Sequence, residues 1–230
     1  MGLQLLTTLL AITIILLVLR AAKQVADAHA TLAYLPKYIA IFCAVWLFYL
    51  AGLSYFEVLT SFVLPPRIPL LVIIPLFLIM GVTLFRPATG IALSTLSFSY
   101  LIYIQSFRLI VELIIWGGYK EGFIPLIATF EGYNYDIVVG LTAVPIAHYA
   151  KKAAASRGVL IAWNVAGLII LGNTVRVFIA SVYFPEWLGK SEALIGPEFV
   201  TLPFLLIAGL FMPFAVYVHA LSIKQLLAHE

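Results

Sequence analysis

Seven long apolar segments restrict this chain to a helical membrane fold. They comprise residues 3–19, 36–57, 66–85, 91–117, 136–150, 159–184 and 199–223. A helix that crosses a bilayer needs about 20 apolar residues, because hydrocarbon offers no hydrogen bonds to an unpaired backbone. Only 10% of the residues are charged, whereas soluble domains carry about 25%. We therefore predict an all-α polytopic bundle of seven transmembrane helices, in a single domain of residues 1–230.

The distribution of basic residues predicts how these helices are threaded. Eight lysines and arginines fall on one side of the predicted bundle: Arg20, Lys23, Lys37, Arg86, Lys151, Lys152, Arg157 and Lys224. The opposite loops hold three, namely Arg67, Lys120 and Lys190. Cytoplasmic loops carry the excess of positive charge. The sequence therefore predicts an N-terminus outside the cell and a C-terminus in the cytoplasm. The apolar residues 122–130 are too few to span and predict an interfacial or re-entrant segment.

A polar stripe runs along the fourth apolar segment. Ser94, Gln105, Arg108 and Glu112 follow one another at separations of 11, 3 and 4 residues, which return to nearly the same helix face at 3.6 residues per turn. A charge at membrane depth must face protein or water, because hydrocarbon cannot solvate it. The stripe therefore predicts a polar centre inside the bundle.

The sixth segment carries a second arginine at similar predicted depth. Arg176 shares a helix face with Asn173, so two arginines would face the polar centre with Glu112 as its one acid. The missing negative charge has two sources that the sequence leaves open. One is the outer segment, with Glu131, Asn134 and Asp136. The other is a bound carboxylate or phosphate, which arginine holds in bidentate fashion.

Two histidines form a weaker candidate site. His148 and His219 are both expected near the inner ends of their helices, where paired histidines can bind a haem or a metal ion. Two histidines without close spacing are more often interfacial residues. No cofactor is expected.

Two stretches of sequence resemble known families. The string NTVRV at residues 173–177 is similar to the arginine-bearing helix of exosortase-type transpeptidases. Those enzymes need a cysteine near the outer face, whereas Cys43 is expected near the inner one. The strings QSFRLIVEL at residues 105–113 and TFEGYNYDIVVGLTA at residues 129–143, together with His219, resemble a group of bacterial seven-helix integral membrane proteins with no known activity. This second resemblance implies a location in the bacterial inner membrane.

Three functions fit these features. The first is binding or transport of a small anionic or zwitterionic solute in an outward-facing polar cavity, where Arg108 and Arg176 hold the anion and Glu112 carries a proton. The second is an intramembrane enzyme that acts on a lipid or peptide at the outer leaflet, with Glu112 or Asp136 as general base. The third is an accessory subunit of a membrane complex, since an oligomer or a partner subunit is compatible with the short loops. The net charge of +3 is small and its basic residues are dispersed, so we expect no nucleic-acid partner.

Overall fold

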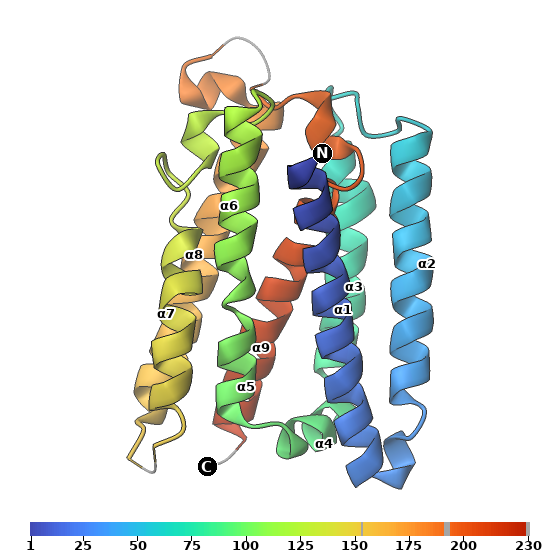
Figure 1. The fold of residues 1–230 in the computed structure, drawn as a ribbon, viewed down its shortest axis with the longest axis vertical. Coiled ribbons are helices and arrows are strands. Elements are labelled where there is room, and N and C mark those ends of the chain that lie inside the picture. The colour runs from blue at the N-terminus through green and yellow to red at the C-terminus, as the bar shows by residue number, and fades with distance from the viewer. Residues whose placement is uncertain (153, 191–193, 229–230) are drawn as a thin grey trace.

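The computed structural model describes residues 1–152, 154–190 and 194–228, and this part of the chain is all-α, without a β-strand. Most helices lie side by side along the long axis of one bundle (Figure 1). The α-helices are α1 Gly2–Ala28, α2 Leu35–Tyr55, α3 Ile74–Leu84, α4 Pro87–Thr95, α5 Phe98–Ile104, α6 Phe107–Lys120, α7 Asp136–Tyr149, α8 Arg157–Tyr183 and α9 Met212–Leu227. The 3₁₀ turns are η1 Ala30–Leu32, η3 Leu126–Ala128, η4 Pro185–Leu188 and η5 Pro197–Val200, and the π-helical turns are η2 Pro69–Ile73 and η6 Ile207–Phe211.

The apolar helices make this chain a multi-pass integral membrane protein. Five helical stretches of the described chain are long and apolar enough to cross a membrane: Gly2–Ala28, Ala30–Tyr55, Phe98–Lys120, Arg157–Tyr183 and Ile207–Leu227. A sixth results if η2, α3 and α4 count as one span, although the chain bends by 77° before α4. Helix α7 has 14 residues, fewer than the roughly 20 that span a bilayer as a single helix.

The fourth span begins later than the sequence pattern indicates. Residues 91–117 are predicted as one helix, but α4 ends at Thr95 and α5 begins at Phe98. The backbone is extended at Leu96 and Ser97 between the two helices, and the Ser97 side chain caps the start of α5 by accepting a hydrogen bond from the Tyr100 amide (3.3 Å). Helix α4 lies across one end of the bundle (Figure 1). Ser94 is therefore on a different helix from the other members of the predicted polar stripe.

The last span also starts later than predicted. The 3₁₀ turn η5 ends at Val200 and a bend and turns follow to residue 205, so the continuous helical stretch runs from the π-turn η6 into α9. The irregular start moves the span toward the C-terminus, and α9 crosses the bundle obliquely (Figure 1). The last turns of α9 are hydrogen-bonded to the bend between α3 and α4. Lys224 donates to the Leu84 carbonyl (2.5 Å), and Gln225 donates to the Leu93 carbonyl (2.7 Å).

Helix α2 satisfies carbonyl groups of both π-turns. The Trp46 indole N–H donates to the Gly209 carbonyl of η6 (2.7 Å), and the Tyr49 hydroxyl donates to the Leu71 carbonyl of η2 (2.9 Å). An irregular backbone at membrane depth is tolerated where side chains pair its polar groups. The two π-turns pack against each other, so α2 stabilises the irregular centre of the bundle.

Candidate functional site

The polar centre forms where α5 passes into α6. Gln105 and Ser106 form a tight turn. The Arg108 amide donates to the Gln105 carbonyl, and the Leu109 amide donates to the Ser106 carbonyl. Helix α7 comes unusually close at this point, because a Cβ atom added to Gly140 would lie 2.6 Å from the Leu109 nitrogen. Asp136 lies one turn before Gly140 on α7. The missing side chain at Gly140 thus allows the approach that brings Asp136 to Arg108.

Arg108 and Asp136 form a buried, bidentate ion pair. The Arg108 Nε donates to Asp136 Oδ2 at 2.7 Å, and Arg108 Nη2 contacts Asp136 Oδ1. The side chains are 1% and 6% exposed, so neither charge is solvated by water. Asp136 lies in the first turn of α7, where the helix dipole also favours a negative charge. Of the two protein acids that could supply the missing charge, the structure therefore places Asp136 at the arginine.

His219 of α9 and Asn164 of α8 extend the Arg108–Asp136 pair into a larger buried polar cluster. Arg108 Nη1 donates to His219 Nε2 (2.8 Å), and His219 Nδ1 lies 2.8 Å from Asn164 Oδ1. Since arginine has no acceptor, Nε2 must accept, and the ring proton is then on Nδ1 and is donated to Asn164. Gly167 leaves room for this ring, because a Cβ atom there would lie 2.5 Å from His219 Nε2. His219 is thus a neutral hydrogen-bonded partner of Arg108.

Glu112 belongs to a second branch of the cluster, organised by Asn134. The Asn134 amide nitrogen lies 2.8 and 2.9 Å from the two Glu112 carboxylate oxygens. Its carbonyl oxygen accepts from the Thr174 hydroxyl (2.7 Å) and from the Asp136 amide (3.1 Å). Glu112 and Asn134 are fully buried. Asn134 thereby connects α6, α7 and α8 at the level of the ion pair.

Gln105 joins the cluster's helix to α9. Its side-chain nitrogen donates to the Ala215 carbonyl (3.0 Å), whereas its buried Oε1 finds no partner in the described chain. Gln105 therefore packs α5 against α9, and its side chain makes no hydrogen bond to the Arg108–Asp136 pair within the described chain.

Three residues of the predicted polar site, Arg176, Asn173 and Glu131, lie away from the cluster. Arg176 is exposed on α8 and donates to the Asn173 side chain (2.9 Å), which in turn donates to the Tyr133 carbonyl (2.6 Å). Glu131 is exposed and accepts from the Trp116 indole (3.1 Å). The helix phase explains the position of Arg176, because Thr174, two residues earlier, faces the cluster and donates to the Asn134 side chain.

The second arginine therefore does not share a cavity with Arg108, contrary to the sequence expectation. The paired histidines also differ from expectation. His148 is exposed and bonds its own helix at the Val144 carbonyl (2.9 Å), while His219 has both ring nitrogens engaged. The irregular start of the last span places His219 in mid-helix, deeper than predicted. No group of three or more His, Cys, Asp or Glu side chains in the described chain could hold a metal ion.

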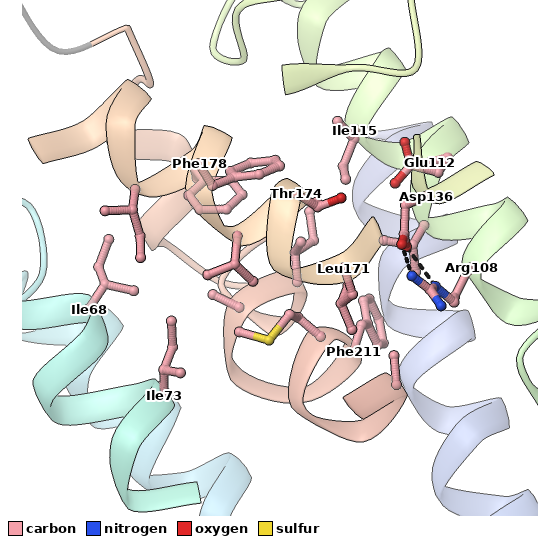
Figure 2. Close-up of a pocket in the computed structure, with 18 of the residues that line it drawn as sticks. Ile68, Ile73, Arg108, Glu112, Ile115, Asp136, Leu171, Thr174, Phe178 and Phe211 are labelled. Carbon is pink, nitrogen blue, oxygen red and sulfur yellow. Dashed lines mark hydrogen bonds and ion pairs between the residues drawn. The ribbon is translucent and has the colours of Figure 1, made fainter. Parts of the chain in front are cut away.

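An apolar cavity of about 80 Å³ ends on the charged cluster. Arg108, Glu112, Asp136 and Thr174 line one end, and Figure 2 shows apolar side chains such as Ile68, Ile73 and Phe178 toward the other. At roughly 10–15 Å³ for each water molecule, this space corresponds to about six waters. The sequence predicted a polar, outward-facing cavity, whereas the observed lining is largely aliphatic and aromatic.

Both π-turns contribute to the cavity wall. Pro69 and Ile73 come from η2, and Ile207, Ala208 and Phe211 come from η6. Such turns inside helices occur frequently at functional sites. Sequence reasoning missed these residues. The prolines next to both turns were signals, but proline is also ordinary in membrane helices.

The cavity approaches the surface on one side. The lining residues that are only half-buried are Pro69, Ile73, Val175, Phe178, Ile179 and Met212. They belong to η2, α8 and the start of α9, so the cavity lies closest to the outer surface of the bundle along these elements. An apolar group inside this cavity would lie beside the buried carboxylates of Glu112 and Asp136. Comparison with known proteins finds no matching family model, no matching curated protein and no matching solved structure.

Proposed function

We propose that this protein crosses the bacterial inner membrane seven times, with its N-terminus outside and its C-terminus in the cytoplasm. Three features support this threading. The start of α1 and the end of α9 lie toward opposite ends of the bundle (Figure 1), as an odd number of crossings requires. The loop before α7 buries Phe123, Ile124 and Ala128, and irregular backbone at membrane depth needs such cover. The excess of basic residues on the C-terminal side fits a cytoplasmic location.

Its function is to bind a small amphipathic molecule whose apolar part occupies the cavity between α6, α8 and the two π-turns. The observation that carries this proposal is the cavity itself, which has apolar walls and ends on Glu112, Asp136 and Arg108. Empty apolar space inside a close-packed bundle forfeits dispersion contacts. An apolar group of six to eight heavy atoms, about the size allowed by the volume, would recover these contacts.

The geometry favours this ligand over the anionic or zwitterionic solute suggested by two facing arginines. Arg108 already directs Nε and Nη2 to Asp136 and Nη1 to His219. Arg176 is on the exposed face of α8 and does not line the cavity. An anion would therefore have to displace Asp136 from a buried bidentate pair, which is costly.

Filling the cavity tests the proposal. Leu171 is a buried lining residue in mid-α8, and Leu171→Phe would occupy part of the space. In nanodiscs, we expect this variant to reduce binding of hexan-1-ol at least tenfold, measured by saturation-transfer NMR with empty nanodiscs as the partition blank. Ile169→Phe is the matched control, because Ile169 is 69% exposed on the same helix and the substitution should leave binding unchanged.

Two results would refute the proposal. One is a folded Leu171→Phe variant that binds hexan-1-ol as tightly as the wild type. The other is loss of binding of hexanoate in Arg176→Gln, since only a solute held by both arginines depends on the Arg176 charge. Arg176→Gln should leave the affinity of a ligand in the cavity lined by Leu171 unchanged, because Arg176 does not line that cavity.

An accessory subunit is a second candidate, favoured by the exposed Arg176 inside the span Arg157–Tyr183. A charge on the outer face of a bundle is expensive next to lipid and is offset by an acidic group of a neighbouring protein. Arg176→Glu would then dissociate the complex, which the mass of the protein in native nanodiscs would show. An unchanged mass would exclude an ion pair of this kind.

A further inference from the structure

The ion-pair geometry leaves one acid of the buried cluster without a basic partner. In the described part of the chain, the ion pairs within 4.0 Å join Lys23 to Asp27 and Arg108 to Asp136. The charge of Arg108 is therefore matched by Asp136. Glu112, one helical turn from Arg108, is contacted instead by the uncharged amide of Asn134.

His219 does not supply the missing positive charge. Its Nε2 accepts the Arg108 hydrogen bond and its Nδ1 carries the single ring proton toward Asn164. A second ring proton on Nε2 would meet the Arg108 N–H head-on, donor against donor. The hydrogen-bond pattern thus holds His219 neutral while the Arg108 contact is intact.

The cavity wall has the same charge imbalance. Its titratable residues are Arg108, Glu112, Asp136 and Tyr183, and Arg108 is already paired. Tyr183 lies away from the cluster, where its hydroxyl accepts from the Ile68 amide (3.1 Å). The unmatched group that borders the cavity is therefore the Glu112 carboxylate, which has two oxygens and one protein donor group.

We infer that the ligand of this cavity is a lipophilic amine, whose ammonium group pairs with Glu112 while its apolar body fills the space between α8 and the π-turns. This inference rests on the proposed function and adds the charge of the ligand to it. A carboxylate accepts up to about four hydrogen bonds, so an ammonium group can donate to Glu112 without displacing Asn134. A buried carboxylate without a counter-charge is strongly disfavoured, and a ligand that supplies the opposite charge relieves this cost.

A series of probes with one apolar chain and three head groups tests the inference. Hexylammonium, hexan-1-ol and hexanoate have nearly the same size and differ in charge. We expect wild-type protein in nanodiscs to bind hexylammonium at least tenfold more tightly than hexan-1-ol, and hexanoate most weakly. Saturation-transfer NMR at fixed pH and ionic strength, with subtraction of the signal from empty nanodiscs, measures the three affinities.

Two acid-to-amide substitutions assign the preference to one carboxylate. Glu112→Gln keeps the size and removes the charge, so the preference for hexylammonium over hexan-1-ol should disappear while hexan-1-ol still binds. Glu121→Gln is the control, because Glu121 is an exposed acid at the end of α6 and its loss should change nothing. Circular dichroism and size-exclusion chromatography check that both variants fold.

Each remaining outcome separates the two proposals. If hexan-1-ol and hexylammonium bind wild-type protein equally and Leu171→Phe blocks both, the cavity binds ligand but the amine is refuted, and Glu112 carries a proton instead. If sodium ions compete with hexylammonium at Glu112 without affecting hexan-1-ol, an inorganic cation takes the place of the amine. If no probe binds, the proposed function fails and the inference fails with it. Should Glu112→Gln not fold, the comparison of the three probes on wild-type protein decides alone.

Discussion

Replacing Asp136 by asparagine should destabilise the protein far more than the same change in an exposed ion pair. Asp136 and Arg108 have side chains that are 6% and 1% exposed, so the variant leaves a buried guanidinium without a counter-charge. Removing one partner of a buried pair costs roughly 3–5 kcal/mol. Asparagine keeps one acceptor oxygen for the Arg108 Nε, so we expect the lower part of this range, about 3 kcal/mol.

The matched control is Asp27→Asn. Asp27 accepts from Lys23 at 3.3 Å within α1, but the two side chains are 66% and 73% exposed. Exposed pairs of this kind contribute less than about 1 kcal/mol. Reversible unfolding in mixed micelles with increasing sodium dodecyl sulfate, followed by circular dichroism, gives both free energies of unfolding.

A free energy of unfolding for Asp136→Asn within about 1 kcal/mol of the wild-type value would contradict a buried ion pair, and so would an equally large loss of stability in Asp27→Asn. A double-mutant cycle with Arg108→Gln isolates the pair itself. The two single substitutions should not add, because each one already breaks the same contact, and we expect a coupling of at least about 1.5 kcal/mol.

Three further substitutions, one of them a control, test the packing beside His219 and the hydrogen bond to η6 by the same unfolding titration. Gly167→Ala should cost about 1–3 kcal/mol by overpacking against His219, since a Cβ atom there would lie 2.5 Å from the ring. Gly172→Ala on the same helix has nothing within 4 Å and should be neutral or stabilising by up to about 1 kcal/mol; equal costs would mean that the ring moves aside freely. Trp46→Phe should cost about 1–3 kcal/mol because it leaves a buried carbonyl of η6 without its donor, and an unchanged stability would mean that this carbonyl finds another partner.

The candidate site could be predicted from the sequence in part. Arg108, Glu112 and Asp136 line the cavity, and all three belong to the predicted set, because charged residues in apolar segments are conspicuous. Arg176 was equally conspicuous but lies on the other side of its helix. Depth along a helix follows from counting residues, whereas the direction of a side chain depends on how that helix is rotated against its neighbours.

Other features had no signal that sequence reasoning could use. His219 was assigned to the inner end of its span, because a 3₁₀ start and a π-turn displace the helix without changing its apolar composition. The close approach at Gly140 and the room at Gly167 also involve residues that are far apart in the chain. Glycine is common in membrane helices, so these two positions did not stand out among 15 glycines.

The sequence by itself determined the class of this protein, an all-α membrane bundle with charges inside its apolar segments. Hydropathy decides that much, since this chain is 64% hydrophobic and apolar runs of about 20 residues cross a bilayer as helices, which pair their own backbone groups. The tertiary structure alone decided which charges meet. Arg108 pairs with Asp136 from α7 and His219 from α9, which leaves Glu112 beside an apolar cavity with a surplus of negative charge. The physical reason is that pairing requires contact within about 3 Å, and helix rotation, close backbone approach and irregular turns set such contacts.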